Sequence, residues 1–184
     1  MSPARSAATV AVGLALCGGS ASAHPLDEVI QAAYLTIAPG EIQLDLEIQP
    51  GILVAQDIAR VVDANGDRRI SPAEARAYGE RTLRNSSLTV DGGPATLRLV
   101  NVETPPYAQL AQGYIMHIHA VATRRDRVGA RVFAYLNRYA PLKSQYQANV
   151  FLSAGSGWTF DVASQGHSPD GRGLTVAYRA VRAS

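Results

Sequence analysis

The strongest constraint on the fold is a period of two between apolar and polar residues in residues 41–49. The alternation places four aliphatic residues on one side and five polar residues on the other: Ile42, Leu44, Leu46 and Ile48 against Glu41, Gln43, Asp45, Glu47 and Gln49. Successive side chains of a strand point to opposite faces, so the segment is predicted to be a half-buried strand. Ala38-Pro39-Gly40 marks a turn ahead of it, and residues 34–37 and 41–48 are predicted to form a hairpin.

The same alternation returns in the second half of the chain. It predicts six further strands, at residues 87–90, 95–102, 114–123, 130–137, 146–152 and 174–181. Turn-forming residues separate several of them, at residues 91–93, 126–129 and 170–171. Many short strands at this spacing predict an antiparallel β-sandwich or a β-barrel, and the pattern does not choose between the two.

Between the hairpin and these strands, the period changes from two to that of a helix. Apolar residues recur at the spacing i, i+4, i+7 and i+8 at Val54, Ile58, Val61 and Val62. A second helix is predicted from Pro72 to about Asn85, with inward-facing residues at Ala75, Tyr78 and Thr82 or Leu83. The fold class is therefore predicted to be α+β, with a helix-loop-helix inserted at residues 52–85 of a β-rich domain.

Length and charge limit the function classes. The chain has 184 residues, of which 47% are apolar, which suits one compact domain. Its net charge is only +2, so no long basic surface is expected and nucleic acid is not expected as a partner. The spacings typical of nucleophile elbows, phosphate-binding glycine loops and zinc-protease helices do not occur, and the protein is predicted not to be an enzyme.

The N-terminal segment has the pattern of a secretory signal peptide. Arg5 is followed by an apolar stretch at residues 7–17 and by small residues ending in Ala21-Ser22-Ala23. This pattern predicts cleavage after Ala23, which divides the chain into a signal peptide at residues 1–23 and a single secreted or periplasmic domain at residues 24–184. No later apolar run is long enough to predict a membrane span.

Cys17 gives an alternative reading of the same segment. Leu14-Ala15-Leu16-Cys17 is similar to a lipoprotein box, in which the cysteine is acylated and anchors the chain. Such boxes carry a small residue directly before the cysteine, and here that residue is Leu16. Ordinary cleavage is therefore the favoured prediction, and it leaves a mature chain without cysteine or disulfides.

The loop between the predicted helices has the spacing of a calcium site. Residues 63–74 place oxygen-bearing side chains at loop positions 1, 3, 5, 9 and 12, and this region, over residues 54–84, resembles the EF-hand family. The resemblance implies Ca²⁺ as the bound ion, held by six residues: Asp63, Asn65, Asp67, Arg69 through its backbone carbonyl, Ser71 directly or through water, and Glu74 through both carboxylate oxygens. Ile70 is expected to point toward the core.

Three features qualify that resemblance. Arg68 stands where the family has glycine, so a positive φ and weak binding, in the range of about 10⁻⁴ to 10⁻³ M, are expected. The alternative is that residues 71–74 form only a helix-capping box and residues 63–67 only ordinary turns. EF-hands usually occur in pairs, so the β-rich domain, a protein partner or a second copy in a homodimer must cover this one.

Histidines indicate a second candidate site. Cleavage would leave His24 at the N-terminus, where its amine and ring nitrogen could chelate Cu²⁺ or Ni²⁺, while Pro25 blocks amide coordination. His117 and His119 lie two residues apart on a predicted strand and hence on one face, with Met116 and Ile118 on the core face. A wet strand face is the alternative explanation.

The mature opening adds a further resemblance. His24-Pro25-Leu26-Asp27 followed by a hairpin is faintly similar to the extracytoplasmic start of bacterial nickel permeases of the hydrogenase and urease accessory type. The likeness implies an extracytoplasmic metal-binding or accessory role as the alternative function. His167, in a predicted loop at residues 166–173, is a weaker candidate.

Overall fold

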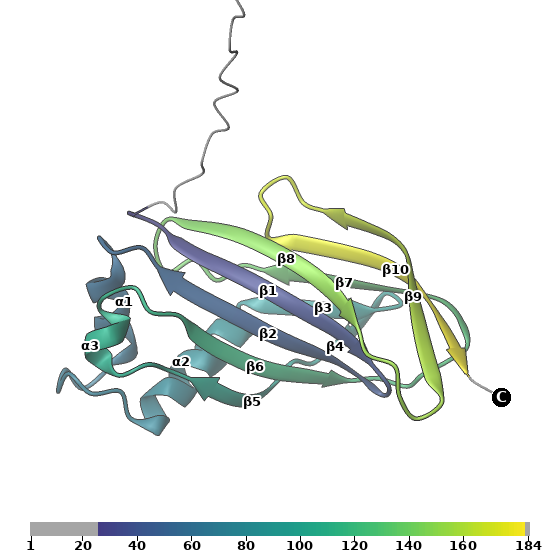
Figure 1. Cartoon of the computed structure of the whole chain (residues 1–184), viewed down its shortest axis with the longest axis horizontal. Coiled ribbons are helices and arrows are strands. Elements are labelled where there is room, and N and C mark those ends of the chain that lie inside the picture. Colours follow the sequence, from purple (N-terminus) through teal and green to yellow (C-terminus); the bar gives the residue numbers. More distant parts are fainter. Residues whose placement is uncertain (1–25, 183–184) are drawn as a thin grey trace, which may run out of the picture.

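The chain folds into two five-stranded β-sheets with a few helices at one end (Figure 1). The computed structural model describes residues 26–182, so the predicted signal peptide, Cys17 and His24 lie outside the described residues. The strand order is β5-β6-β2-β1-β8 in the first sheet and β4-β3-β7-β10-β9 in the second. The β-rich, sandwich-like α+β class predicted from the sequence is confirmed.

The first sheet contains the predicted hairpin. Its strands are β1 (Val29–Ala38), β2 (Glu41–Pro50), β5 (Arg98–Glu103), β6 (Met116–Thr123) and β8 (Ser144–Leu152). The prediction of a wholly antiparallel fold is wrong at one place, because β1 and β8 are parallel. The chain crosses from the second sheet just before β8, and the backbone N–H of Val29 bonds the carbonyl of Lys143, so both strands begin at the same end.

The second sheet contains a strand that the alternation did not predict. Its members are β3 (Ser86–Val90), β4 (Gly93–Ala95), β7 (Gly129–Asn137), β9 (Trp158–His167) and β10 (Gly173–Arg182). Strand β9 lies at the sheet edge and is mostly exposed, so it needs no apolar face. The predicted strand at residues 95–102 is also wrong, because the segment divides between β4 and β5, which belong to different sheets.

The hydrophobic core lies between the two sheets. The predicted inward face of β2 is confirmed, since Ile42, Leu44, Leu46 and Ile48 are each 2% exposed or less. The opposing sheet contributes large side chains from β7 and β10, including Phe133, Tyr135, Val176 and Tyr178. The alternate residues of β2 are consequently left on the outer face of the first sheet.

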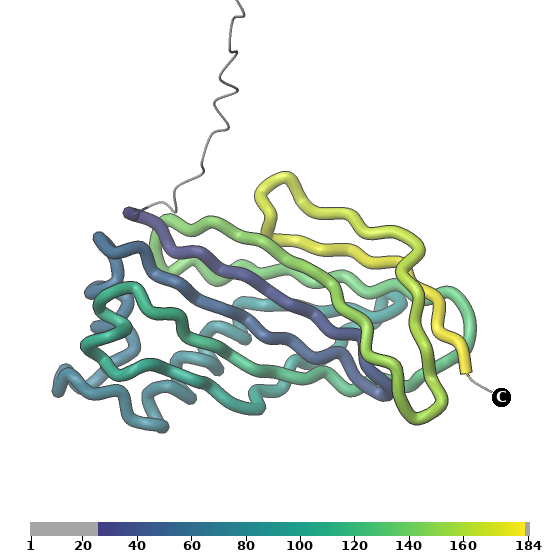
Figure 2. Tube along the Cα trace, in the orientation of Figure 1, coloured from purple at the N-terminus to yellow at the C-terminus, as the bar shows by residue number. Residues whose placement is uncertain are grey.

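The helices occupy one end of the sandwich (Figure 2). They are α1 (Ala55–Val62), α2 (Pro72–Arg84) and the short α3 (Tyr107–Leu110), which the sequence did not predict. Helix α1 packs against α3, and α2 packs against β5. The buried sides of α1 and α2 are thus covered by other elements of the same chain.

The helix pattern is confirmed with one correction. Ile58 and Val62 of α1 are buried, as are Ala75, Tyr78, Thr82 and Leu83 of α2. Val61, predicted to belong to the inward stripe, is 44% exposed, because Ala55, Ile58, Ala59 and Val62 form the buried face of α1 and Val61 lies to one side of it. Within residues 26–182, no helix combines the length and the apolar character needed to cross a membrane.

Candidate metal centres

The carboxylate of Asp63 organises the loop between α1 and α2. It is 5% exposed, and its two oxygens accept backbone N–H groups from Gly66 at 2.9 Å, Asp67 at 3.2 Å and Arg68 at 2.9 Å. One side chain at loop position 1 therefore curls the backbone of positions 4 to 6 around itself. An ordinary turn needs only one such bond.

Glu74 closes the loop from the other end. Its Oε2 accepts the Ser71 N–H at 2.9 Å and the Ser71 hydroxyl at 2.7 Å, while the N–H of Glu74 donates to Ser71 Oγ at 3.3 Å. This reciprocal pair is the capping box that the sequence offered as an alternative, and it is present. Hydrogen bonds from Ser71, first from its backbone and then from its hydroxyl, hold the pKa of the Glu74 carboxyl below its usual range.

The second oxygen of Glu74 reaches beyond the cap. Oε1 accepts the backbone N–H of Asn65 at 3.2 Å, so loop position 12 lies against loop position 3. Asn65 and Asp67 are joined as well, because the Asp67 N–H donates to Asn65 Oδ1 at 2.9 Å. The side chains at loop positions 1, 3 and 12, predicted as calcium ligands, thus all turn toward the inside of the loop. Their oxygens accept hydrogen bonds from the loop's own N–H groups.

Two residues of the loop adopt left-handed backbone conformations. Gly66 has φ = 75°, which costs glycine little, and Arg68 has φ = 62°, as expected for the position where the family has glycine. The N–H of Arg68 bonds to Asp63 Oδ2 and holds that conformation. Ile70 packs against the hydrophobic core, as predicted.

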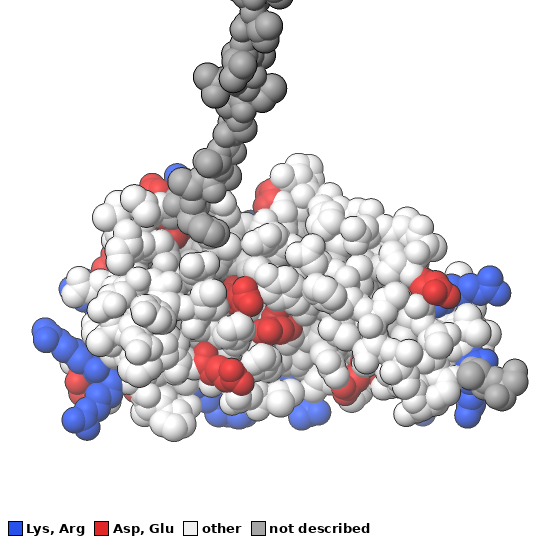
Figure 3. All heavy atoms as spheres, in the orientation of Figure 1, with Lys and Arg blue, Asp and Glu red and all other residues white. Residues whose placement is uncertain are grey.

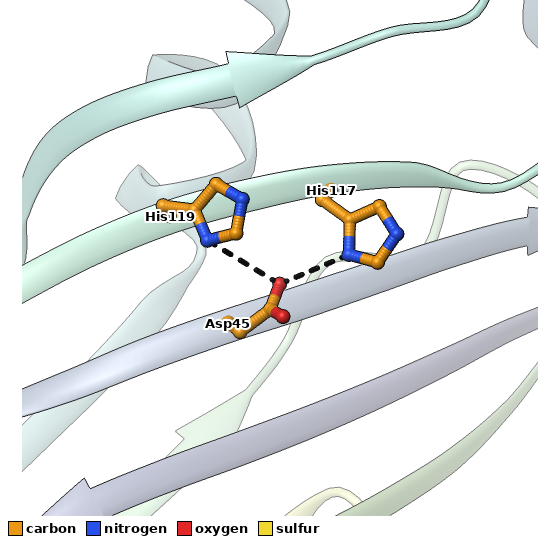
Figure 4. A group of neighbouring side chains, drawn as sticks. All are labelled: Asp45, His117 and His119. Atoms are coloured by element: carbon orange, nitrogen blue, oxygen red, sulfur yellow. Dashed lines mark hydrogen bonds and ion pairs between the residues drawn. The ribbon is translucent and has the colours of Figure 1, made fainter.

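A different group of side chains satisfies the distance requirement of a metal site. Within residues 26–182, one group of three His, Asp or Glu side chains has ligand atoms that all lie within 4.8 Å of one another: Asp45, His117 and His119. Both imidazoles direct Nδ1 at the same carboxylate oxygen, Asp45 Oδ1, at 3.3 Å from His117 and 3.6 Å from His119 (Figure 4). No residue of the 63–74 loop belongs to this group.

Strand register builds this group. His119 lies opposite Asp45 and His117 lies opposite Glu47 in the antiparallel pair of β2 and β6. Met116 and Ile118 are fully buried on the other face, as predicted, so the two histidines share the outer face. Their rings are parallel to within 5°, with centroids 5.9 Å apart, and each side chain is 32% exposed.

A β-bulge adds a further carboxylate. The register of β5 against β6 shifts by one residue between Leu99 and Asn101, which changes the face that the following residues occupy. Glu103 is thereby placed opposite His117, and its Oε1 lies 3.5 Å from His119 Nε2. Glu47 completes the surroundings, with Oε1 3.9 Å from His117 Nδ1.

The electrostatic environment of the histidines is acidic. Figure 3 shows acidic groups gathered over the middle of the β1-β2-β6 face, with Lys and Arg toward the margins. In the described part of the chain, Asp45, Glu47 and Glu103 make ion pairs only with the two histidines and with no Lys or Arg. A hollow of about 480 Å³, lined in part by Asp45 and His119, opens beside them. The site is therefore suited to a cation.

The third described histidine, His167, joins neither group. His24 lies outside the described residues, so an amine-dependent site at the N-terminus stays a prediction. His167 ends β9 rather than lying in a loop, and its Nε2 lies 2.8 Å from the carbonyl oxygen of Ala148.

The sequence pattern does not identify the carboxylates of this site. It places Asp45 only on the polar face of an alternating strand, and it gives no sign of a role for Glu103. The available signal was the pairing of two half-buried strands, each with ligand-type residues on its polar face, but their register could not be read from either strand alone.

Comparison with known proteins does not assign either centre. The chain matches no protein-family model, no curated protein and no solved structure. The EF-hand resemblance therefore depends on the loop residues themselves, and the histidine group depends on its geometry.

Proposed function

We propose that this protein is an extracytoplasmic calcium-binding protein in which the 63–74 loop holds one Ca²⁺ in a structural or sensory role. The observation that carries the proposal is the closure of the loop, in which Asp63 gathers three N–H groups and Glu74 reaches Asn65. A capping box accounts for the contacts between Glu74 and Ser71 only. The contact between loop positions 12 and 3 goes beyond such a box and brings the Glu74 carboxylate to the start of the loop, where a calcium loop needs its twelfth residue.

The ligand set follows from the loop positions. Asp63, Asn65 and Asp67 supply one side-chain oxygen each, Arg69 supplies its backbone carbonyl, and Ser71 supplies a hydroxyl or a bridging water. Glu74 supplies two oxygens once its carboxylate leaves Ser71. Ca²⁺ accepts six to eight such oxygens at about 2.3 to 2.6 Å.

Weak binding is expected for two physical reasons. Calcium must replace the hydrogen bonds that Ser71 and Asn65 donate to Glu74. Arg68 and Arg69 also bring positive charge to the loop. A dissociation constant of about 10⁻⁴ to 10⁻³ M suits an extracellular module, and the signal-peptide pattern at residues 1–23 agrees with such a location.

The test is a calorimetric titration of the mature chain, residues 24–184, with Ca²⁺ up to about 10 mM. We expect one site, and Glu74→Gln should weaken binding at least about 10-fold because a neutral amide cannot give two charged oxygens. Glutamine still completes the capping box through its one carbonyl oxygen but loses the acceptor of the Asn65 N–H, so the free energy of unfolding should fall by only about 1 kcal/mol and the chain should remain folded. Glu80→Gln is the matched control, since Glu80 lies on the same helix, is partly exposed and, among the residues that the structure describes, pairs only with Arg76.

Three results would reject the proposal. The first is the absence of any calcium-dependent heat over that range, and the second is an unchanged affinity in Glu74→Gln. Equal weakening in Glu74→Gln and Glu80→Gln would indicate a general charge effect and would also count against it.

A further inference from the structure

The outer face of the first sheet carries a group of metal-ligating side chains that is separate from the 63–74 loop. We propose that Asp45, His117 and His119 bind one divalent transition-metal ion, with Zn²⁺ the best geometric fit. This site differs from the calcium loop in position and in ligand chemistry, since it offers two imidazole nitrogens and one carboxylate oxygen. Imidazole favours zinc, copper and nickel over calcium.

The ligand spacing indicates the coordination geometry. Bonds of about 2.0 to 2.2 Å in a tetrahedral zinc site separate neighbouring ligand atoms by about 3.3 to 3.5 Å. A square or octahedral arrangement brings adjacent ligands to about 2.9 Å. Asp45 Oδ1 lies 3.3 Å from one Nδ1 and 3.6 Å from the other, closer to a tetrahedral edge than to a square or octahedral one, and all three ligand atoms lie within 4.8 Å of one another.

Hydrogen bonding holds these side chains only loosely, since His117 Nδ1 makes one long hydrogen bond to Asp45 Oδ1 at 3.3 Å and His119 Nδ1 lies 3.6 Å away. Charge-assisted N–H···O bonds are about 2.7 to 2.9 Å long, and both contacts to Asp45 exceed that range. The imidazoles stack in parallel, and both direct Nδ1 at the same oxygen of Asp45. A metal ion between the three ligand atoms satisfies both observations.

The surrounding carboxylates fit supporting roles. His119 Nε2 is buried and has no hydrogen-bond partner among the described residues, yet Glu103 Oε1 lies 3.5 Å from it. When Nδ1 binds a metal, Nε2 carries the proton, and a carboxylate that accepts it orients the ring. Glu47, 3.9 Å from His117 Nδ1, is placed to supply a fourth ligand or to hold a water in that position.

The experiment is a titration of the chelator-treated mature chain with Zn²⁺. We expect one site. His119→Ala and Asp45→Asn should each lower the Zn²⁺ affinity by more than about 100-fold, and Glu103→Gln should lower it by about 10-fold. His167→Ala is the matched control and should leave the affinity unchanged, because His167 lies on β9 in the other sheet. An unchanged affinity in His119→Ala would overturn the assignment.

Two further arms separate this site from the other candidates. Adding one glycine before His24 displaces the terminal amine, and Glu74→Gln disables the calcium loop. We expect neither change to alter zinc affinity. Loss of zinc binding in the extended chain would move the site to the N-terminus and overturn the proposal, whereas failure of the calcium titration alone leaves it intact.

Cobalt provides a spectroscopic test of the geometry. Tetrahedral Co²⁺ absorbs visible light far more strongly than octahedral Co²⁺, and Co²⁺ commonly replaces Zn²⁺ in such ligand sets. We expect strong visible bands that appear with one equivalent of Co²⁺ and disappear when Zn²⁺ is added. Weak bands typical of six-coordinate cobalt would contradict the tetrahedral assignment.

Discussion

The two candidate centres are assembled in opposite ways. The loop at residues 63–74 takes all its ligands from twelve consecutive residues, which are held together by their own backbone N–H groups. The centre on the sheet takes its ligands from strands β2 and β6, which are far apart in the chain and meet through register. The loop can therefore be recognised from the sequence alone, whereas the group on the sheet can be recognised only when the pairing of its strands is known.

The comparison also separates stability from binding. Asp63 is buried and holds the loop whether or not a cation is near, whereas the Asp45 side chain is 36% exposed and faces two histidines. Ligands in the loop should consequently contribute to the folded state itself. Ligands on the sheet face should contribute mainly to metal affinity.

Replacing Asp63 or Asp45 should give the largest difference in the free energy of unfolding between the two centres. Asp63→Ala deletes the acceptor of three backbone N–H groups, and we expect the free energy of unfolding to fall by about 3 kcal/mol. Asp45→Ala removes a partly exposed carboxylate and should cost less than about 1 kcal/mol. Urea denaturation of both variants in the presence of chelator measures the difference, and equal losses would contradict the contrast.

The backbone at Arg68 gives a smaller test within the loop. Because the folded chain holds this residue at φ = 62°, Arg68→Gly should stabilise the protein by about 1 kcal/mol. Arg69→Ala removes the same charge without relieving a left-handed conformation, so it isolates the charge effect on Ca²⁺ affinity. A loss of stability in Arg68→Gly, measured by urea denaturation, would show that the loop gains nothing from glycine there.

Local patterns explain what could be predicted. The alternation along β2, the spacing of Ile58 and Val62 in α1, and the inward position of Tyr78 in α2 reflect which side of each element meets the core. Each of these features can be read from one segment. The positive φ of Arg68 followed from the loop position alone. These features depend on neighbouring residues and not on the path of the chain.

Non-local pairing explains what was missed. Strand β9 has little apolar alternation because it lies at an edge, and the parallel pair of β1 and β8 depends on a crossing between sheets. The position of Glu103 beside His119 depends on a one-residue bulge. A shift of register by one residue would turn its side chain to the opposite face, so no single-strand pattern could have placed it.

The smallest expected effect concerns the core that supports both centres. Burial raises the pKa of the Tyr135 hydroxyl from its ordinary value of 10.0 to about 12. The folded state therefore keeps a proton that the unfolded chain loses, so this contribution to stability is complete below about pH 10 and is lost as the pH rises toward 12. In Tyr135→Phe, stability should change by less than about 0.5 kcal/mol at neutral pH, because the hydroxyl has no hydrogen-bond partner within residues 26–182.

The alkaline limb of the stability profile carries the decisive comparison. From neutral pH to about pH 10.5, the parent protein should lose about 0.8 kcal/mol more than Tyr135→Phe, since phenylalanine has no proton to release. Urea denaturation at several pH values measures both curves. The parent protein and Tyr135→Phe should bind Ca²⁺ with equal affinity and Zn²⁺ with equal affinity at neutral pH, because Tyr135 lies between the sheets and belongs to neither centre. Parallel curves would show that the Tyr135 hydroxyl titrates alike in the folded and unfolded chains.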